Sequence, residues 1–221
     1  MRETDTHDNT VRAIEEGRIV TILRGLTEEQ LVLTCEAMAR GGIRLAEVTF
    51  DACGDPTDET VAGYIRTLVT HFRGRLHIGA GTVLTERQVA LAAEAGAEFI
   101  ISPDTNEAVI RATRAAGLVS IPGAFTPSEA TRAHRAGADF IKLFPNSEVK
   151  LSYLKALAVP LSHIRFLAVG GVNDENLADY LRAGACGVGI ATGIVNKGLI
   201  AAGDYDGITA LAEKYVRAAG L

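Results

Sequence analysis

The chain repeats one short unit along its length. Residues 94–103, EAGAEFIISP, recur as residues 135–145, RAGADFIKLFP, and looser copies occupy residues 40–49, 115–122 and 182–190. Each copy combines an alanine-rich helix end, a glycine suited to the left-handed residue that follows a helix, and a short apolar strand. Regular alternation of helices and strands is typical of βαβ units. The repeat therefore predicts an α/β fold with a parallel sheet.

Eight apolar segments have the length and composition of strands. Helical patterns lie between them, for example at residues 85–95 and 126–136, which begin with threonines suited to N-caps. Further helices are expected at residues 10–16 and 207–217. The predicted strands cover roughly residues 18–24, 45–50, 77–82, 99–102, 119–122, 140–144, 165–170 and 186–190.

The number of these units favours a closed barrel. Eight strand–helix units in 221 residues fit a compact (β/α)8 TIM barrel, so we expect one domain over residues 1–221 with a short N-terminal helix. The alternative is an open doubly wound sheet. That fold is disfavoured because residues 22–25, ILRG, follow the first strand, where a dinucleotide-binding fold carries GxGxxG.

Charge and cysteine content exclude several classes of function. The net charge of −5 gives no basic surface for nucleic acid. The three cysteines are widely spaced and form no CxxC, so neither a disulfide framework nor a zinc ribbon is expected. The polar first nine residues are unlike a signal peptide, and no stretch approaches the roughly 18 apolar residues of a membrane span. We expect a cytoplasmic protein without nucleic-acid or membrane partners.

One lysine stands inside an otherwise apolar strand. Lys142 lies in residues 138–145, ADFIKLFP, whereas the other lysines lie in polar or helical segments. Lysine is rarely buried unless it is paired or used chemically, and burial lowers its pKa toward the neutral, nucleophilic form. A Schiff-base lysine needs this property. The alternative is a strand-end lysine whose amine reaches water.

A glutamate occupies a comparable position in the second predicted strand. Glu47 lies in residues 45–50, LAEVTF, and shares a strand face with Thr49. Taken alone, Glu47 could form a salt bridge in the barrel core. Together with Lys142 at the end of another strand, it would supply an acid/base beside an amine, as Schiff-base chemistry requires. Lys142 and Glu47 are therefore the predicted catalytic residues.

Other residues at the strand ends are candidates for substrate binding, because the C-terminal ends of barrel strands meet at one site. The five histidines are scattered without a metal-binding pattern, so neither a metal nor a cofactor is expected. The candidates are Arg24, Thr49, Thr82, Pro103, Pro122 and Phe144.

Glycines after the last two predicted strands form an expected phosphate site. Bare backbone N–H groups there, with a short helix opening near Ile194, would bind an anion. Tight turns without a ligand are the alternative. The candidate residues are Gly170, Gly171, Gly189 and Thr192.

Short motifs along nearly the whole chain resemble those of one enzyme family. They are ILRG at 22–25, EVT at 47–49, GAGTVL at 79–84, ISP at 101–103, IPG at 121–123, FIKLFP at 140–145, GGV at 170–172 and AGDYD at 202–206. Together they are similar to the 2-keto-3-deoxy-6-phosphogluconate / 4-hydroxy-2-oxoglutarate aldolase family. The resemblance implies a class I, metal-free aldolase on a (β/α)8 barrel, usually a homotrimer.

The resemblance also implies roles for individual residues. Lys142 would form the Schiff base and Glu47 would act as general acid/base. Thr82 would help to hold the carboxylate of the pyruvyl group. The phosphate would be held by Gly170, Gly171 and Thr192.

Two positions depart from the gluconate-type pattern. Many members carry an arginine shortly after the glutamate, where this chain has Asp51, and a threonine before the glycine pair, where it has Val169. A carboxylate at position 51 would repel the substrate carboxylate, so either Asp51 points away or Arg24 supplies the cation. Galactonate-type relatives resemble this chain at both positions, which leaves the configuration at the fourth substrate carbon open.

The leading hypothesis is reversible cleavage of 2-keto-3-deoxy-6-phosphogluconate to pyruvate and glyceraldehyde 3-phosphate. Alternatives within the family are the phosphogalactonate epimer and 4-hydroxy-2-oxoglutarate. A different class is a sugar-phosphate epimerase or isomerase barrel, which would use Glu47 and Lys142 for proton transfer without a covalent step. A non-catalytic phosphate-binding barrel is the remaining alternative.

Overall fold

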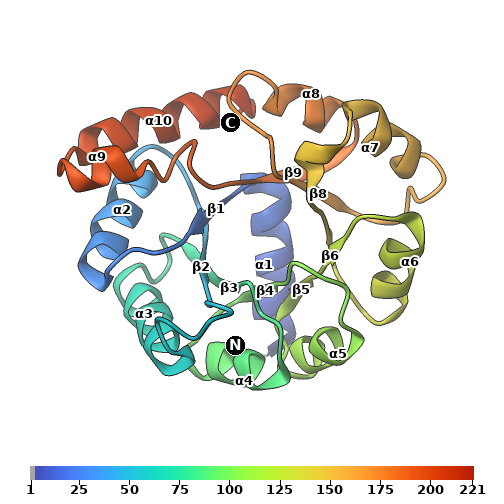
Figure 1. Cartoon of the computed structure of the whole chain (residues 1–221), viewed down its shortest axis with the longest axis horizontal. Coiled ribbons are helices and arrows are strands. Elements are labelled where there is room, and N and C mark those ends of the chain that lie inside the picture. Colours follow the sequence, from blue (N-terminus) through green and yellow to red (C-terminus); the bar gives the residue numbers. More distant parts are fainter. Residues whose placement is uncertain (1–2) are drawn as a thin grey trace.

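Helices and strands alternate along the computed structural model, which describes residues 3–221 (Figure 1). The strands are β1 (Ile19–Leu23), β2 (Leu45–Thr49), β3 (His77–Gly81), β4 (Phe99–Ile101), β5 (Val119–Ile121), β6 (Gly123–Ala124), β7 (Ile141–Leu143), β8 (Phe166–Val169) and β9 (Ala185–Ile190). The helices are α1 (Glu3–Gly17), α2 (Glu28–Arg40), α3 (Asp58–His71), α4 (Glu86–Glu94), α5 (Glu107–Ala115), α6 (Pro127–Arg135), η1 (Asn146–Glu148), α7 (Leu151–Ala158), α8 (Leu177–Arg182), α9 (Lys197–Ala201) and α10 (Tyr205–Ala218).

The strands form one parallel sheet that closes into a barrel. Their order is β5-β4-β3-β2-β1-β9-β8-β7-β6. Only Pro122 separates β5 from β6, so the two ends of this order meet. The predicted (β/α)8 barrel is therefore confirmed, with the other helices around the ring of strands and α1 across the middle of the ring in this view (Figure 1).

The fifth predicted strand differs from the prediction because it is divided in two. Pro122 has no N–H group to donate to a neighbouring strand, so the strand is interrupted there. Its carbonyl oxygen accepts a hydrogen bond from the backbone N–H of Lys142 at 2.9 Å. Beyond it, β6 pairs with β7. Pro122 thus lies at the seam where the barrel closes.

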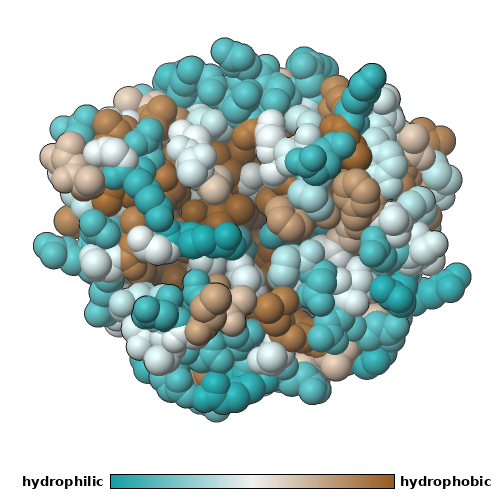
Figure 2. All heavy atoms as spheres, in the orientation of Figure 1, coloured by the Kyte–Doolittle hydropathy of each residue, from teal (hydrophilic) through white to brown (hydrophobic). Residues whose placement is uncertain are grey.

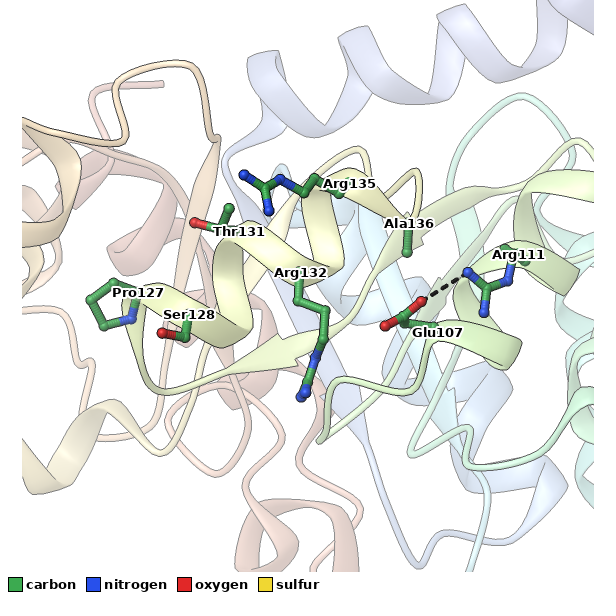
Figure 3. A pocket seen from close by; sticks show the side chains of 8 residues that line it. All are labelled: Glu107, Arg111, Pro127, Ser128, Thr131, Arg132, Arg135 and Ala136. Carbon is green, nitrogen blue, oxygen red and sulfur yellow. Dashed lines mark hydrogen bonds and ion pairs between the residues drawn. The ribbon is translucent and has the colours of Figure 1, made fainter.

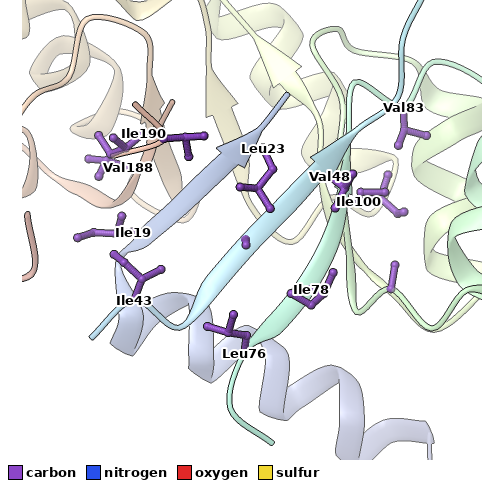
Figure 4. Close-up of a cluster of buried hydrophobic side chains, with 14 of the residues drawn as sticks. Ile19, Leu23, Ile43, Val48, Leu76, Ile78, Val83, Ile100, Val188 and Ile190 are labelled. Carbon is purple, nitrogen blue, oxygen red and sulfur yellow. The ribbon is translucent and has the colours of Figure 1, made fainter. Parts of the chain in front are cut away.

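Two layers of buried apolar side chains hold the barrel together. The larger layer lies between the strands and the surrounding helices, and Figure 4 shows part of it around β1, β2 and β3, with Ile19, Val48 and Ile78 among the labelled residues. The smaller cluster includes strand residues such as Phe99, together with Ile14 of α1 and Phe140 just before β7. Removal of this apolar surface from water is the main force that stabilises such a barrel.

The N-terminal helix is longer than predicted. Helix α1 spans Glu3–Gly17, whereas the sequence predicted a helix only at residues 10–16. Its Ile14 is fully buried in the smaller apolar cluster, and the Thr10 hydroxyl donates to Glu98 just before β4 at 3.0 Å. His7 lies 3.2 Å from the carboxylate of Asp139. Because these partners lie where strands begin, α1 covers the N-terminal end of the barrel.

The predicted helix boundaries are otherwise close to the observed ones. Thr85 and Thr126 are N-caps, and Thr126 forms a capping box with Glu129. The last helix, α10, begins two residues earlier than predicted, after the N-cap Asp204. None of the helices within residues 3–221 combines the length and apolar character of a membrane-spanning segment.

Candidate active site

A cavity of about 570 Å³ opens at the C-terminal ends of the barrel strands. The face drawn in Figure 2 is hollowed near its middle, where apolar surface lies beside hydrophilic side chains. Residues at or just after the ends of several strands form the walls. Most of the predicted site residues line this cavity, namely Arg24, Glu47, Thr82, Pro103, Lys142, Phe144, Gly170, Gly171, Gly189 and Thr192.

Lys142 is buried in β7 and its side chain lines the cavity. Only 7% of the residue is exposed, so the amine does not extend into bulk solvent. Its Nζ lies 4.6 Å from the centre of the Phe144 ring. Burial lowers the pKa of Lys142, the nearby Glu47 carboxylate opposes this shift, and the positive charge of Arg24 adds to it. These surroundings make the amine easier to deprotonate than that of an exposed lysine.

Glu47 is the buried carboxylate of the cavity. It is 2% exposed, and burial raises its pKa to about 6, although the positive charges of Lys142 and Arg24 oppose the shift. Its Oε2 atom has no hydrogen-bond partner within the described residues. A buried carboxylate oxygen without a partner is costly, and such groups occur at functional sites.

The two ionisable side chains influence each other without direct contact. No ion pair forms between Lys142 and Glu47, yet each charge shifts the pKa of the other. A small hollow beneath them is lined by apolar side chains, including Ile101, Ile121 and Leu167. This apolar floor explains why burial is the largest cause of both shifts. The arrangement can supply a neutral amine and a proton acceptor to one bound molecule.

Arg24 lies at the rim and is held by two threonines. Its Nη2 donates to the Thr82 hydroxyl at 2.9 Å, and its Nε donates to the Thr49 hydroxyl at 3.4 Å. Thr82 has a φ of 56°, which is uncommon for a β-branched residue and is typical of strained functional sites. The guanidinium group is thus fixed where it could meet an anionic group of a ligand.

Two predicted residues lie outside this cavity. Thr49 is buried beside β1, where it donates to the carbonyl of Leu23 at 3.3 Å and accepts from Arg24. Pro122 is buried at the seam of the barrel. The alternation of side chains along a strand predicts whether a residue such as Thr49 points toward the barrel axis or away from it. It does not predict whether that side chain reaches the cavity.

The glycine pair after β8 forms part of the cavity wall. Gly170 and Gly171 have φ values of 101° and 72°, which glycine adopts without strain. A Cβ atom on Gly171 would lie 3.0 Å from the Cα of Ser147. The predicted helix near Ile194 begins three residues later, because Asn196 is the N-cap of α9. Residues 192–195 form a turn instead.

Lys197 also lines the cavity and was not among the predicted residues. Its Nζ lies 3.1 Å from the point that a Cβ atom on Gly25 would occupy. Its sequence context indicated only a helical lysine. The signal that could have revealed it is its place shortly after the last strand, at the same end of the barrel as Thr192.

A second cavity, of about 610 Å³, lies outside the barrel between α5 and α6 (Figure 3). Its side chains come from the outer surfaces of these helices, and Glu107 and Arg111 form an ion pair of 2.9 Å there. It contains none of the predicted site residues. Within residues 3–221, no group of three or more histidine, cysteine, aspartate or glutamate side chains could hold a metal ion.

Comparison with known proteins identifies one family. The family model described as "KDPG and KHG aldolase" matches residues 11–211. A protein of Rhizobium meliloti (strain 1021) named "Probable 2-dehydro-3-deoxy-6-phosphogalactonate aldolase" is 36% identical over 190 residues, which are 86% of each chain. A protein of Treponema pallidum (strain Nichols) named "2-dehydro-3-deoxy-phosphogluconate aldolase" is 33% identical over 95% of this chain and 97% of its own.

Solved structures agree with this result. A KDPG aldolase from Legionella pneumophila, described with pyruvate captured at low pH as a covalent carbinolamine intermediate, superposes with a TM-score of 0.81. It is 26% identical, and the match covers 96% of this chain and 97% of that chain.

Proposed function

The chain belongs to the KDPG (2-keto-3-deoxy-6-phosphogluconate) and KHG (4-hydroxy-2-oxoglutarate) aldolase family, and from this premise we propose that it is a class I, metal-independent aldolase with its Schiff base on Lys142. It cleaves 2-keto-3-deoxy-6-phosphogluconate reversibly to pyruvate and glyceraldehyde 3-phosphate. The observation that supports this most strongly is the pair of buried ionisable residues, Lys142 and Glu47, whose pKa values burial shifts in opposite directions.

The reaction begins at the amine of Lys142. Neutral Nζ attacks the C2 carbonyl carbon, and the resulting carbinolamine loses one water to give the imine. The Glu47 carboxylate accepts the proton of the C4 hydroxyl while the C3–C4 bond breaks, which releases the aldehyde and leaves an enamine. Protonation at C3 and addition of one water to the imine then release pyruvate and restore the amine.

The remaining cavity residues bind the two ends of the substrate. Arg24 and Thr82, which are hydrogen-bonded to each other at 2.9 Å, hold the carboxylate next to C2. Pro103 and Phe144 line the cavity around the reacting carbons, and Gly189 leaves room beside them. The phosphate lies at the turns that contain Gly170, Gly171 and Thr192, where backbone N–H groups favour anions.

Borohydride trapping tests the covalent step. Incubation with pyruvate and borohydride should add one reduced pyruvyl group, and peptide mass spectrometry should place it on Lys142. Lys142→Arg should abolish trapping, because a guanidinium group is not deprotonated in proteins. The matched control, Lys155→Arg at an exposed lysine of α7, should be trapped like the natural protein. A label on another lysine would overturn the assignment, and no label would favour an epimerase or a phosphate-binding barrel.

A second candidate substrate is 2-keto-3-deoxy-6-phosphogalactonate. Val169 lines the cavity immediately before the glycine pair, where a threonine hydroxyl could otherwise contact the substrate, and Asp51 is not among the cavity residues. A relative that is 36% identical carries the galactonate name. Values of kcat/KM for the two epimers, measured with a coupled assay for pyruvate, decide between them. Sedimentation equilibrium would test the homotrimer that the family resemblance implies.

A further inference from the structure

Lys197 adds a positive charge to the cavity that neither the covalent step nor the glycine turns use. It is the first residue of α9 and lines the same cavity as Gly170, Gly171 and Gly193. The residue is exposed, in contrast to Lys142. Two lysines therefore line one cavity: Lys142 is buried near its apolar floor, and Lys197 lies at its solvent-exposed wall.

The amine of Lys197 has no anionic partner in the described part of the chain. Lys214 pairs with Asp174, whereas no carboxylate forms an ion pair with Lys197. Arg24, by comparison, is already bonded to Thr49 and Thr82. The Nζ atom of Lys197 also lies only 3.1 Å from the Cβ position of Gly25, so a glycine there leaves room for the ammonium group.

The balance of charge along the cavity favours a ligand with more than one negative charge. Its ionisable lining residues are Arg24, Lys142 and Lys197 on the positive side and only Glu47 on the negative side. Glu47 is buried, so it cannot neutralise an ammonium group at the exposed wall. The glycine turns offer backbone N–H groups but no full charge, whereas a phosphate near neutral pH carries between one and two negative charges.

We propose that Lys197 is a specificity-determining residue that pairs with the terminal phosphate of the substrate and selects phosphorylated over unphosphorylated 2-keto sugar acids. This inference rests on the proposed aldolase function. Lysine acts as a point charge toward phosphate, and its ammonium group would add a charge-assisted contact to the backbone donors of the glycine turns. The reacting end of the substrate lies at Lys142, so the chemical step does not depend on Lys197.

The test compares Lys197→Met with the natural protein on matched substrates. For the phosphorylated substrate, KM should rise roughly 10-fold or more, as expected for loss of one hydrogen bond to a charged group, and kcat should change little. KM for the unphosphorylated 2-keto-3-deoxy sugar acid should stay nearly constant. Lys197→Arg should restore most of the affinity, and Lys155→Met at the exposed position on α7 is the control.

Two further measurements separate this inference from the proposed function. Inorganic phosphate should compete with the phosphorylated substrate of the natural protein and compete far less with Lys197→Met. Pyruvate trapping by borohydride should be equal in both. If KM rises equally for both substrates while trapping persists, Lys197 does not bind the phosphate and the inference is wrong. If the natural protein fails to trap pyruvate, the aldolase function itself is wrong.

Discussion

At the scale of single residues, burial has opposite effects on the two ionisable side chains of the cavity. It raises the pKa of Glu47 to about 6 and lowers that of Lys142, because in each case burial destabilises the charged form. Their mutual attraction limits both shifts. The result is an amine that can lose its proton more readily than an exposed lysine, beside a carboxylate that can accept and return one close to neutral pH.

Replacing Glu47 by glutamine tests this coupling. Turnover should fall by ~10²–10⁴, because a positioned general acid/base is lost. The Glu47 charge raises the pKa of Lys142, so its removal should lower that pKa further. In Glu47→Gln, pyruvate trapping should therefore reach half of its maximal rate at a lower pH than in the natural protein. A shift to higher pH, or near-normal turnover, would contradict the assigned role.

The residue scale also shows which site residues a sequence can predict. That Lys142 and Glu47 line one cavity could be predicted, because a charged residue within an apolar strand is unusual and both stand at strand ends. Thr49 was predicted to bind the substrate; it does not line the cavity and instead accepts a hydrogen bond from Arg24. Its distance from the cavity depends on the neighbouring strands, which the sequence of one strand does not give. Lys197 was missed since a lysine at a helix start is common and only the folded chain brings it to Gly25.

At the scale of elements, β3 provides the space that the carboxylate of Glu47 occupies. A Cβ atom on Gly81 would lie 2.5 Å from the carboxyl carbon of Glu47, and one on Gly79 would lie 2.2 Å from the Phe99 ring. Both distances are shorter than non-bonded atoms tolerate. The glycines of this strand are therefore required by side chains of the neighbouring strands β2 and β4 rather than by backbone conformation.

Gly81→Ala should displace the carboxylate of Glu47. We expect kcat to fall roughly 10²-fold, since a shift of about 1 Å in a catalytic group can cost that much. Pyruvate trapping at Lys142 should persist. The matched control is Gly63→Ala in α3, where a Cβ atom meets nothing within 4 Å and alanine should stabilise the helix by ~0.5–1 kcal/mol. Unchanged kcat in Gly81→Ala would show that Glu47 has freedom to move.

Elements with local signals were predicted well, and those set by distant contacts were not. The strands and the caps at Thr85 and Thr126 follow from apolar runs and threonines. The break at Pro122 follows from a missing N–H group, although its place at the seam depends on β7. The first turns of α1 are polar, and their contacts with Glu98 and Asp139 lie far away in the sequence.

At the scale of the whole molecule, the packing of α1 and the cavity lie at opposite ends of the barrel. Helix α1 covers the N-terminal end, where Ile14 packs with Val20, Leu45 and other residues of the smaller apolar cluster. The cavity opens at the opposite, C-terminal end of the strands. In barrels of this class, one face carries the active site and the other contributes mainly to stability. Substitutions at the two ends should therefore have different consequences.

Ile14→Ala tests this separation. Ile14 is fully buried, so its truncation should lower the free energy of unfolding by ~2–5 kcal/mol, through lost apolar contact and the cavity left behind. Well below the unfolding transition, kcat and KM should match those of the natural protein, because Lys142 and Glu47 lie at the other end of the barrel. Arg12→Ala, at an exposed position two residues before Ile14 on α1, should change stability by less than about 0.5 kcal/mol.

Urea unfolding followed by circular dichroism measures the stability of both variants, and the coupled pyruvate assay measures their activity. A fall in kcat of Ile14→Ala in the absence of urea, where the variant is fully folded, would show that the packing of α1 affects the geometry of the cavity. Loss of stability without loss of turnover would instead confine α1 to a structural role. We expect the second result, because Ile14 packs in the smaller apolar cluster and is not among the residues that line the cavity with Lys142 and Glu47.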